Sequence, residues 1–323
     1  MNNNFDFQGL LSLRKDLSSD FFGGWEPENI LLVEQYAAKN LKIRERCLTN
    51  FLGVSTSLDF FSWYQPKNGC IIAKLPFPDD GLHAEAIEYI ALCKAFEIAP
   101  KVPYFTAIEL GASFGPWVTA AAKICESLNR TARMTAVEPT PSGIRMMEKH
   151  LKDNGVGTPN FQINILRGCV SDFDGEAFFP ACEVDQDNGG AVSYVDKSVD
   201  YRGVSIPHEK IPVFSLKSIL KDYERVDFLH IDIQGTETVL FQNKDTLDLI
   251  DKKVALFLCA THSRKAEAAI LDGIIGRDWI LYRERPCKYI FDRKKLEIEG
   301  MTTRDGGMIF INRNLVDSTS LRK

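Results

Sequence analysis

From about residue 104 onward, short apolar runs alternate with longer segments whose apolar residues recur at helical spacing. The apolar runs cover residues 104–110, 134–138, 161–170, 226–232 and 254–261. The helical segments between them cover residues 116–129, 143–154, 215–221, 236–250 and 263–276. Strands and helices that alternate at these lengths are typical of parallel βαβ units. The pattern therefore predicts an α/β fold with a doubly wound, mostly parallel, Rossmann-like sheet.

Two further apolar runs lie near the end of the chain, at residues 278–291 and 305–313. No helical segment separates them, so they predict an antiparallel hairpin that finishes the sheet. Residues 171–212 form a long, turn-rich segment that fits no clean helix. A functional lid and a plain irregular surface both fit a segment of this kind.

Before residue 101 the pattern is different. Residues 25–47 and 77–100 each have the spacing of a helix, with Pro27 near the first turn of one and Pro100 at the end of the other. The segment between them is irregular and aromatic. The sequence thus predicts a mostly helical N-terminal portion over residues 1–101 and a main domain over residues 102–323.

Composition and charge narrow the functional classes. The chain of 323 residues is 45% apolar, which is ample for a buried core, but no apolar run approaches the roughly 18 to 20 residues of a membrane helix. We therefore expect no membrane span. Eight cysteines without paired spacing favour reduced thiols in the cytoplasm over disulfides or a zinc site. The net charge of −5 argues against a nucleic-acid partner, which normally needs a basic face.

The segment "FTAIELGASFGPW" combines the end of the first strand with a glycine turn. Glu109 lies at the end of the strand, Gly111 and Gly115 permit a tight turn, and Pro116 suits the first position of a helix. The next strand ends on Glu138, whose carboxylate can accept hydrogen bonds from both hydroxyls of a ribose. Ligands of open α/β sheets bind beyond the carboxyl ends of the strands. The segment therefore predicts a site for a cofactor that contains adenosine.

Two classes of cofactor use such a turn. A dinucleotide site normally has the spacing G-x-G-x-x-G, because the pyrophosphate sits at the helix N-terminus. Here the spacing is E-x-G-x-x-x-G. A carboxylate at the mouth of the turn would repel a pyrophosphate but suits the cationic sulfonium of S-adenosylmethionine. The residues favour S-adenosylmethionine, while a dinucleotide and a turn without any ligand stay open as alternatives.

The segment "RVDFLHIDIQGTETVLF", over residues 225–241, is the most specific in the chain. Together with "AIELGASFGPW", "AVEP" and "RGCVSDFDGEAFF", it resembles the FkbM-type family of S-adenosylmethionine-dependent methyltransferases over roughly residues 102–312. That family typically shows D-x-G-A-x-x-G, V-E-P and a late K-I-D-[VI]-E-G-x-E segment. This chain departs from it with Glu109 for Asp, His230 for Lys and Gln234 for Glu. The resemblance implies a class I methyltransferase fold, S-adenosylmethionine as methyl donor with S-adenosylhomocysteine as product, and a sugar or natural-product hydroxyl as acceptor.

The resemblance also assigns residues to the cofactor. Its amino-acid end would be held by the glycine turn, at Glu109, Gly111, Ala112 and Gly115. Its ribose and adenine would be held by the second strand and the "GCVSD" stretch, at Glu138, Pro139, Val170, Ser171 and Asp172.

Methyl transfer from a sulfonium mainly requires that the acceptor is positioned and water is excluded. A sugar hydroxyl is a poor nucleophile at neutral pH, so a general base would help. Asp232 and His262 would end neighbouring strands on the same edge, and we hypothesise that one or both take the acceptor's proton. The alternative is that each only caps a helix or lies beside a cap. Mg²⁺ fits an acidic edge, but no ligand spacing requires it, so we expect no metal.

Four further residues are candidates for contacts with the acceptor: His83, Tyr201, Arg202 and Gln234. His83 lies at a predicted helix start, where an ordinary N-cap by Asp79 or Asp80 is the alternative. The sequence thus predicts a cytoplasmic S-adenosylmethionine-dependent O-methyltransferase, and the resemblance implies a small-molecule or glycan acceptor. The rivals are an NAD(P)-dependent oxidoreductase on a similar sheet and a non-catalytic protein that retains the fold.

Overall fold

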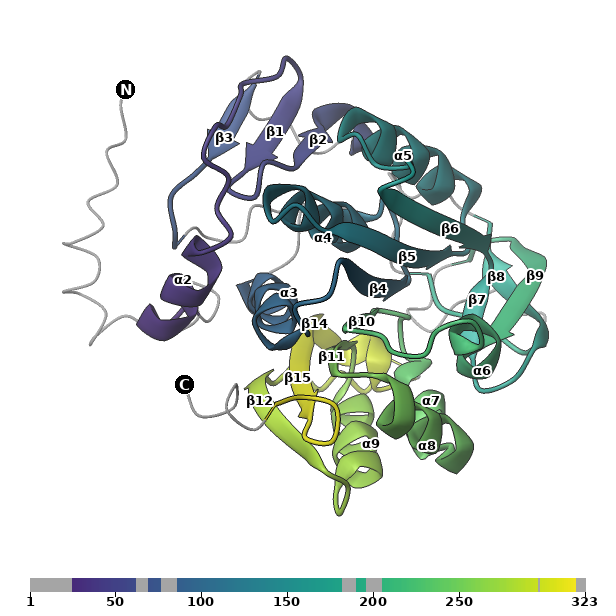
Figure 1. The fold of residues 1–323 in the computed structure, drawn as a ribbon. Helices are drawn as coiled ribbons and strands as arrows, with labels where there is room; N and C mark the ends of the chain where they lie inside the picture. The colour runs from purple at the N-terminus through teal and green to yellow at the C-terminus, as the bar shows by residue number, and fades with distance from the viewer. Residues whose placement is uncertain are drawn as a thin grey trace.

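The computed structural model describes residues 25–61, 69–76, 86–181, 190–195, 205–295 and 297–317 (Figure 1). Its centre is a seven-stranded sheet in the order β12-β15-β11-β10-β4-β5-β6. The bounds are β4 (Tyr104–Leu110), β5 (Thr131–Glu138), β6 (Phe161–Arg167), β10 (Phe228–Ile231), β11 (Leu256–Thr261), β12 (Trp279–Arg285) and β15 (Gly306–Asn312). The strand order reverses between β4 and β10, and ligands bind at such a switch point.

All neighbouring pairs of this sheet are parallel except those that involve β15. The last strand pairs antiparallel with β12, which confirms the predicted hairpin, and it also inserts beside β11. Because it runs against the other strands, β15 begins at the edge where they end. The doubly wound, mostly parallel sheet predicted from the sequence is thus confirmed.

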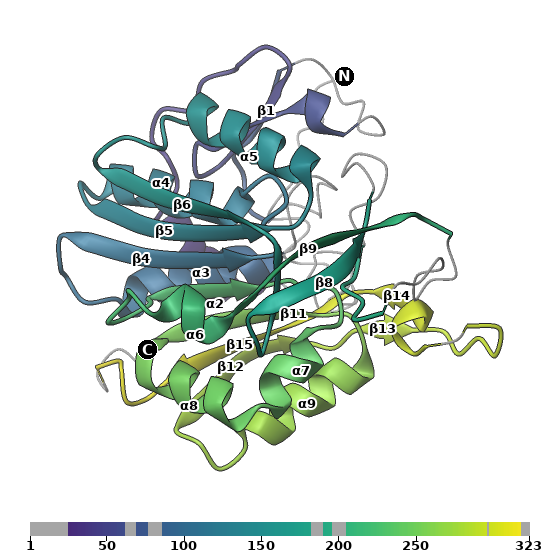
Figure 2. The ribbon, with the colours of Figure 1, turned by 90° about the vertical axis from the view of Figure 1, so that its right-hand side faces the viewer.

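Helices cover both faces of the sheet (Figures 1 and 2). One face carries α3 (Ala86–Ile98), α4 (Pro116–Ser127) and α5 (Pro141–Asp153), and the other carries α6 (Leu216–Leu220), α7 (Glu237–Gln242), α8 (Lys244–Lys253) and α9 (Arg264–Ile274). Successive strand residues alternate between the two cores, so that Phe228 packs in one and Leu229 in the other. This double burial explains why the strands are almost continuously apolar.

The hydrophobic core includes residues from both sides of the predicted boundary at residue 101. Helix α3 packs against β11, β12 and β15, so it belongs to the helix layer of the main sheet. Trp25 and Leu52 from the N-terminal portion lie in the same apolar cluster as Phe105 of β4. The division of the chain near residue 101 therefore stays a prediction about sequence organisation, while the packing is shared.

The N-terminal portion contains strands that the sequence pattern did not predict. The helix predicted over residues 25–47 is wrong beyond its first turns, because α2 (Pro27–Glu34) ends early. A three-stranded sheet follows, formed by β1 (Cys47–Asn50), β2 (Ser55–Ser57) and β3 (Cys70–Ile72). Leu48 of β1 is fully buried against an aromatic cluster that includes Phe60 and Phe114. The burial of Leu48 in the tertiary structure outweighs the helical spacing of the apolar residues that precede it.

Three other predicted bounds need correction. The strand predicted over residues 161–170 is divided, because β7 (Cys169–Ser171) leaves the main sheet and pairs with β9 (His208–Ser215). The turn-rich segment after residue 171 contains β8 (Gly175–Pro180), which pairs with β9. The helix predicted over residues 236–250 breaks at Asn243, whose side chain caps α8. A last pair, β13 (Lys288–Tyr289) and β14 (Thr302–Arg304), lies between β12 and β15 in the chain.

Within the described residues, no helix combines the length and the apolar character needed to cross a membrane.

Candidate active site

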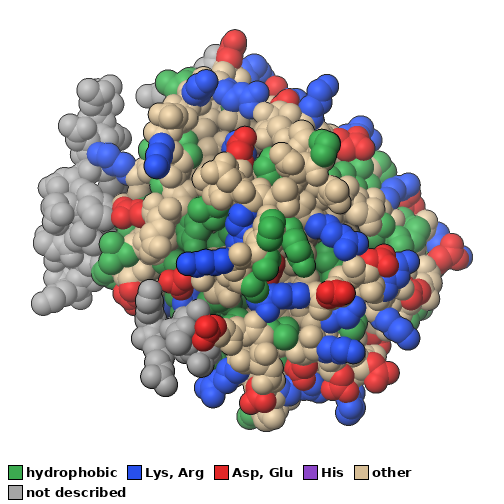
Figure 3. Space-filling model, viewed as in Figure 1, with side chains coloured by type: hydrophobic (Ala, Val, Ile, Leu, Met, Phe, Trp, Pro, Cys, Tyr) green, Lys and Arg blue, Asp and Glu red, His purple; other side chains and the backbone are tan. Residues whose placement is uncertain are grey.

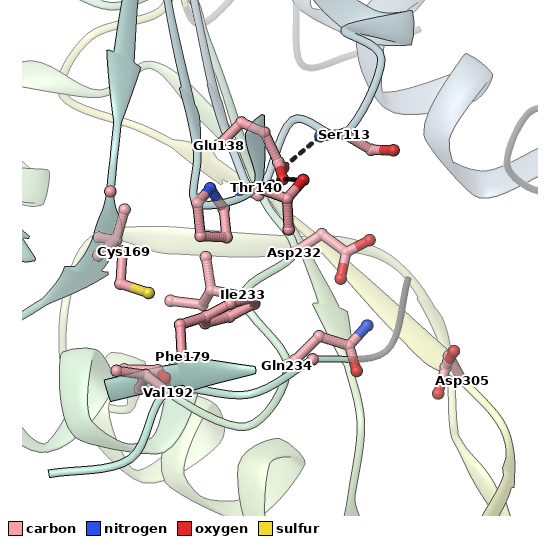
Figure 4. Close-up of a pocket in the computed structure, with 16 residues that line it drawn as sticks. Ser113, Glu138, Thr140, Cys169, Phe179, Val192, Asp232, Ile233, Gln234 and Asp305 are labelled. Atoms are coloured by element: carbon pink, nitrogen blue, oxygen red, sulfur yellow. Dashed lines mark hydrogen bonds between the residues drawn. The ribbon is translucent and has the colours of Figure 1, made fainter. Parts of the chain in front are cut away.

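A cavity of about 250 Å³ lies at the carboxyl ends of β4, β5 and β10, at the switch point of the sheet. This volume is just below the lower end of the roughly 300 to 1,000 Å³ that small-molecule sites enclose. Its walls come from the turn after β4, the end of β5, the β7–β8 region, the β10–α7 turn and the residue before β15. Figure 4 draws the residues that line the cavity and labels ten of them.

The turn after β4 brings two strands unusually close together. Gly111 has a φ of 77°, and a Cβ atom there would lie 1.7 Å from the carbonyl oxygen of Asp232. Gly115 has a φ of 68° and precedes α4 as its N-cap. Between them Ser113 also adopts a positive φ, of 46°. Only glycine allows the backbone of β10 to approach at residue 111, so the predicted glycine turn has a physical cause.

Of the four predicted cofactor contacts of this turn, only Gly111 lines the cavity, and the side chain of Glu109 is turned toward the backbone of α4. Its carboxylate accepts hydrogen bonds from the backbone N–H groups of Val118, at 2.8 Å, and Trp117, at 3.3 Å. The residue is 1% exposed. Burial raises its pKa to about 7, although the charge of His230 and the two backbone donors oppose the rise. Glu109 therefore anchors the first turn of α4, and a direct contact with the cofactor's amino-acid end stays a prediction.

Glu138, in contrast, lines the cavity. Its Oε2 accepts a hydrogen bond from the backbone N–H of Ser113 at 2.8 Å, and its Oε1 accepts from the backbone N–H and hydroxyl of Thr140 (Figure 4). Burial raises the pKa of this carboxyl. Gly143 makes room for it, since a Cβ there would lie 2.7 Å from Oε1. The carboxylate is thus fixed at the cavity wall and can accept hydroxyl donors from a ligand.

One end of the cavity is apolar. Figure 4 shows Cys169, Phe179, Val192 and Ile233 gathered there. The predicted residues Pro139 and Val170 also line the cavity. Such a lining suits a flat, weakly polar ring.

Ser171 and Asp172 are absent from this lining. The hydroxyl of Ser171 is hydrogen-bonded to that of Tyr194 at 2.7 Å, and Asp172 accepts a hydrogen bond from the side chain of Asn243. Their direct contact with adenine stays a prediction. Ala112 is likewise buried, with its N–H donated to Val137.

The other end of the cavity is acidic. Asp232 follows β10 and His262 follows the neighbouring β11, and the structure brings their side chains together, as their shared edge predicts. Nε2 of His262 lies 3.1 Å from Oδ1 of Asp232. This oxygen of Asp232 has no hydrogen-bond partner among the described residues, so its contact with His262 is an ion pair. Nδ1 of His262 lies 2.9 Å from Oε1 of Glu237, which is fully buried.

The charges around His262 decide its protonation. Burial alone would lower its pKa, but the negative charges of Glu237 and Asp232 outweigh burial and raise this pKa well above the ordinary value. Burial would raise the pKa of Asp232, yet the contact with His262 and its charge keep that pKa below the ordinary value. Both shifts favour an imidazolium beside a carboxylate, so Asp232 is the member of the pair better suited to accept a proton.

Glu237 holds this arrangement in place. Its oxygens accept hydrogen bonds from the backbone N–H groups of Ile233, at 3.1 Å, and Gly235, at 2.6 Å. The same carboxylate therefore fixes the β10–α7 turn and the ring of His262. Gln234, one of the predicted acceptor contacts, lies in this turn with a φ of 51° and lines the cavity. Strained backbone of this kind often marks a functional site.

Sequence reasoning missed Asp305. It precedes β15, lines the cavity and points toward the same end as Asp232 and Gln234 (Figure 4). Burial raises its pKa, as do the charges of Asp232 and Glu237, against the opposing charge of His262. A signal existed, because an antiparallel last strand must begin at the edge where the parallel strands end. The other predicted acceptor contacts, His83, Tyr201 and Arg202, lie outside the described residues.

The same residues have the composition of a metal site. Asp232, Glu237 and His262 each offer a ligand atom, and these atoms lie within 4.8 Å of one another. However, the oxygens of Glu237 already accept backbone N–H groups, and His262 contacts a carboxylate with each nitrogen. A cation would have to replace the proton of the imidazolium.

Comparison with known proteins agrees with this geometry. Residues 109–269 match the methyltransferase FkbM domain. The chain is 26% identical over 261 residues to a "putative methyltransferase" of Jannaschia sp. (strain CCS1), with 79% of this chain and 90% of that protein covered. The matched segment begins at Glu109 and extends into α9, so it includes the glycine turn, Glu138 and the Asp232–His262 pair.

Solved structures resemble the chain more distantly. Precorrin-6y C5,15-methyltransferase from Geobacter metallireducens GS-15 is 10% identical with a TM-score of 0.39, and covers 72% of this chain and 89% of its own. A ribosomal protein L11 methylase from Lactobacillus delbrueckii subsp. bulgaricus is 9% identical with a TM-score of 0.35, and covers 71% of this chain and 80% of its own. The domain match and the relative, together with the sheet topology described above, lead to one conclusion: the chain belongs to the FkbM-type family of S-adenosylmethionine-dependent methyltransferases.

Proposed function

We propose that this protein is an O-methyltransferase that methylates a hydroxyl of a sugar, glycan or secondary metabolite. Its family supports methyl transfer from S-adenosylmethionine in general. The observation that carries the finer proposal is Asp232, an ionised carboxylate that lines the cavity and is held by a protonated histidine. Hydroxyl acceptors need such a proton acceptor more than amines or thiolates do, because a hydroxyl must lose its proton during transfer.

The residues of the cavity fit S-adenosylmethionine. The apolar end with Phe179 and Val192 suits adenine, and the fixed carboxylate of Glu138 suits two ribose hydroxyls. The glycine turn offers an exposed backbone rather than side chains to the rest of the ligand, since Gly111 has no room for a Cβ. When bound, S-adenosylmethionine supplies a methyl group already activated by its sulfonium.

Asp232 would accept a hydrogen bond from the acceptor hydroxyl and so orient its oxygen for in-line attack. Methylation of the hydroxyl oxygen would release the hydroxyl proton, and Asp232 would accept it. His262 was an equal candidate for this step on sequence grounds, but its raised pKa favours a positioning role instead. Asp305, at the same end of the cavity, would hold a second hydroxyl of a polyol acceptor.

A small-molecule or glycan acceptor also fits the charge of the chain better than a nucleic acid does. The net charge is −5, and on the face seen in Figure 3 the basic and acidic side chains are interspersed outside the grey atoms. Seven cysteines of the described residues are free thiols. They support our proposal that the reaction takes place in the reducing cytoplasm.

The first test measures cofactor binding by titration calorimetry with S-adenosylhomocysteine and with NAD⁺. We expect S-adenosylhomocysteine to bind and NAD⁺ not to bind. The second test offers S-adenosylmethionine with matched acceptors that carry a hydroxyl, an amine or a thiol on the same sugar, and identifies the product by mass spectrometry. Methyl transfer to the amine or thiol alone, or preferential binding of NAD⁺, would contradict the proposal.

A further inference from the structure

His150 of α5 is a buried, hydrogen-bonded side chain that the proposed function does not use. Its ring is fully buried between Phe60 and Phe114, whose ring centroids lie 6.0 and 5.3 Å away. Both of its nitrogens have polar partners. Buried polar side chains are ordinarily hydrogen-bonded, so the identity of these partners decides what His150 does.

One nitrogen of His150 holds the backbone of the glycine turn, residues 111–115. Nδ1 lies 3.0 Å from the carbonyl oxygen of Phe114 and donates to it, because a carbonyl oxygen can only accept. Thr119 of α4 lies 3.2 Å from the same nitrogen and donates its hydroxyl to the next carbonyl, that of Gly115, at 2.7 Å. These contacts fix the two residues that directly follow Ser113 at the cavity wall.

The other nitrogen of His150 contacts the three-stranded N-terminal sheet. Nε2 lies 3.0 Å from the hydroxyl oxygen of Thr56 in β2, and in the neutral ring it accepts that hydrogen bond. Strand β2 is also joined to the end of α5 (Figure 1). There the backbone N–H and carbonyl of Ser55 bond the side-chain amide of Asn154, at 2.8 and 2.9 Å. Thr56 is therefore placed to orient the ring of His150.

The N-terminal portion also holds the side chain of Phe114. This residue is 4% exposed, and its ring centroid lies 5.8 Å from that of Phe60 and 5.6 Å from that of Phe61. Leu48 of β1 belongs to the same apolar cluster. The carbonyl of Phe114 is thus held by His150, and its ring is held by the N-terminal portion.

The glycine turn needs such support because its backbone is strained. Gly111, Ser113 and Gly115 all have positive φ, and for the serine this conformation is unfavourable. If Phe114 were released, the residue before it would be free to relax. The N–H of Ser113 donates to Glu138, the proposed ribose contact, so this relaxation would reach the cofactor site.

We propose that His150 is a positioning residue that holds the glycine turn in its cofactor-binding conformation, and that the N-terminal sheet orients it through Thr56. The inference gives the N-terminal portion a part in cofactor binding. It goes beyond the proposed function and does not depend on it, because it concerns S-adenosylmethionine whichever group accepts the methyl.

The test compares two variants that each keep one half of the ring's hydrogen bonding. The amide nitrogen of asparagine can take the place of Nδ1 and donate to Phe114, whereas that of glutamine reaches the place of Nε2. We expect His150→Gln to weaken S-adenosylhomocysteine binding about tenfold or more, because the buried carbonyl loses this donor. His150→Asn should bind within about twofold of the native chain, since it restores the donor. Titration calorimetry measures both Kd values.

A second measurement needs no ligand. Four backbone N–H groups of the glycine turn, at residues 111, 112, 113 and 115, donate hydrogen bonds. Their hydrogen exchange is therefore slow while the turn keeps its conformation. We expect exchange in residues 111–115, followed by mass spectrometry, to be about tenfold faster in His150→Gln and unchanged in His150→Asn.

Thr56→Val tests the part of the N-terminal sheet. We expect it to weaken S-adenosylhomocysteine binding about fivefold in the native chain and to have no further effect in His150→Asn, where no ring remains to be oriented. The matched control is Thr49→Val in the neighbouring β1. The hydroxyl of Thr49 is also buried, but it bonds Ser55 within the same small sheet, at 2.9 Å. This control should change neither the Kd nor the exchange.

Denaturant unfolding separates positioning from packing, because a residue that only packs would lower the unfolding free energy and leave the Kd of the folded chain unchanged. An unchanged Kd and unchanged exchange in His150→Gln would therefore overturn the proposal, even if that variant unfolds more easily. An equal loss of binding in His150→Asn would also overturn it, since the ring and not its donor would then matter. A Thr56→Val effect that persists in His150→Asn would overturn the part assigned to the N-terminal sheet.

Discussion

The turns that follow β4 and β10 are built alike but do different things. Both leave parallel strands at the switch point, and each contains a glycine with positive φ, Gly111 and Gly235. A buried glutamate whose oxygens accept backbone N–H groups flanks each turn: Glu109 near the end of β4 and Glu237 at the start of α7. On sequence alone, either turn could present its acid to a ligand.

The difference lies in which acid remains exposed to the cavity. In the first turn the carboxylate of Glu109 is used to anchor α4, so this turn offers mainly backbone. In the second turn Glu237 takes the anchoring role, and Asp232 is left to line the cavity. A buried carboxylate that anchors amides is part of the scaffold, whereas one at the cavity wall can react. We therefore propose that the first turn binds the cofactor and that the second carries the chemistry.

The largest effect is expected from Gly111→Ala, which adds a Cβ atom to the first turn. The added Cβ would lie 1.7 Å from the carbonyl oxygen of Asp232, so the two strands must separate. We expect the free energy of unfolding to fall by about 3 to 5 kcal/mol and S-adenosylhomocysteine binding to weaken more than about 100-fold. Denaturant unfolding and calorimetry measure the two quantities.

The control for this variant is Gly155→Ala. Gly155 has a similar φ of 74° but no atom within 4 Å of the added Cβ. Only the cost of a left-handed residue applies there, about 1 to 2 kcal/mol. Equal losses in the two variants would show that the close approach of β10 is not what residue 111 provides.

The second turn is tested by Asp232→Asn. The amide keeps the shape of the side chain but cannot take a proton, so we expect kcat to fall by about 10² to 10⁴. The Kd for S-adenosylhomocysteine should change by less than about threefold. The control is Asp222→Asn, at an exposed position on the opposite edge. Normal turnover in the Asp232 variant would contradict the assignment of chemistry to this turn.

Glu109→Gln tests the scaffold role of the first acid through pH. The pKa of Glu109 is raised to about 7 in the folded chain, from about 4.5. Its contribution to stability is therefore present below about pH 4.5 and is lost as the pH rises toward about 7. Relative to the glutamine variant, the native chain should lose about 3 kcal/mol of unfolding free energy over this window.

Denaturant unfolding at several pH values measures this difference. The matched control is Glu126→Gln, an exposed carboxylate on α4. The unfolding free energy of this variant should change with pH in the same way as that of the native chain. A Glu109→Gln variant whose stability follows that of the native chain at every pH would show that Glu109 is not a strained buried acid.

The smallest effect is expected from Asp305→Asn. If Asp305 holds a second hydroxyl, this variant should raise the KM for the acceptor about tenfold and leave kcat nearly unchanged. Because its pKa is raised, the native carboxylate is protonated at a higher pH than an ordinary aspartate. The KM of the native enzyme should therefore rise as the pH falls through that pKa, and the variant should lack this rise. A lower kcat instead would indicate that Asp305 takes part in the chemical step.

The sequence predicted the parts of this molecule that depend on local patterns. Apolar periodicity predicted the order of strands and helices from residue 104, because each strand is buried on both faces. The glycine spacing predicted the tight turn after β4, and the shared strand edge predicted that Asp232 and His262 would meet. These features follow from the two or three residues around them and from the rule that parallel strands end on one edge.

Only the tertiary structure decided the rest. The apolar end of the cavity includes Phe179 of β8 and Val192, which packs against the small sheet that β8 forms with the later strand β9. The predicted antiparallel hairpin placed the start of β15 at the right edge, but Asp305 reaches the cavity because β15 also inserts beside β11. The raised pKa of His262 exists only because two carboxylates from different elements face its ring. Long-range pairing and the electrostatics of buried groups depend on which segments meet, and no local pattern encodes that.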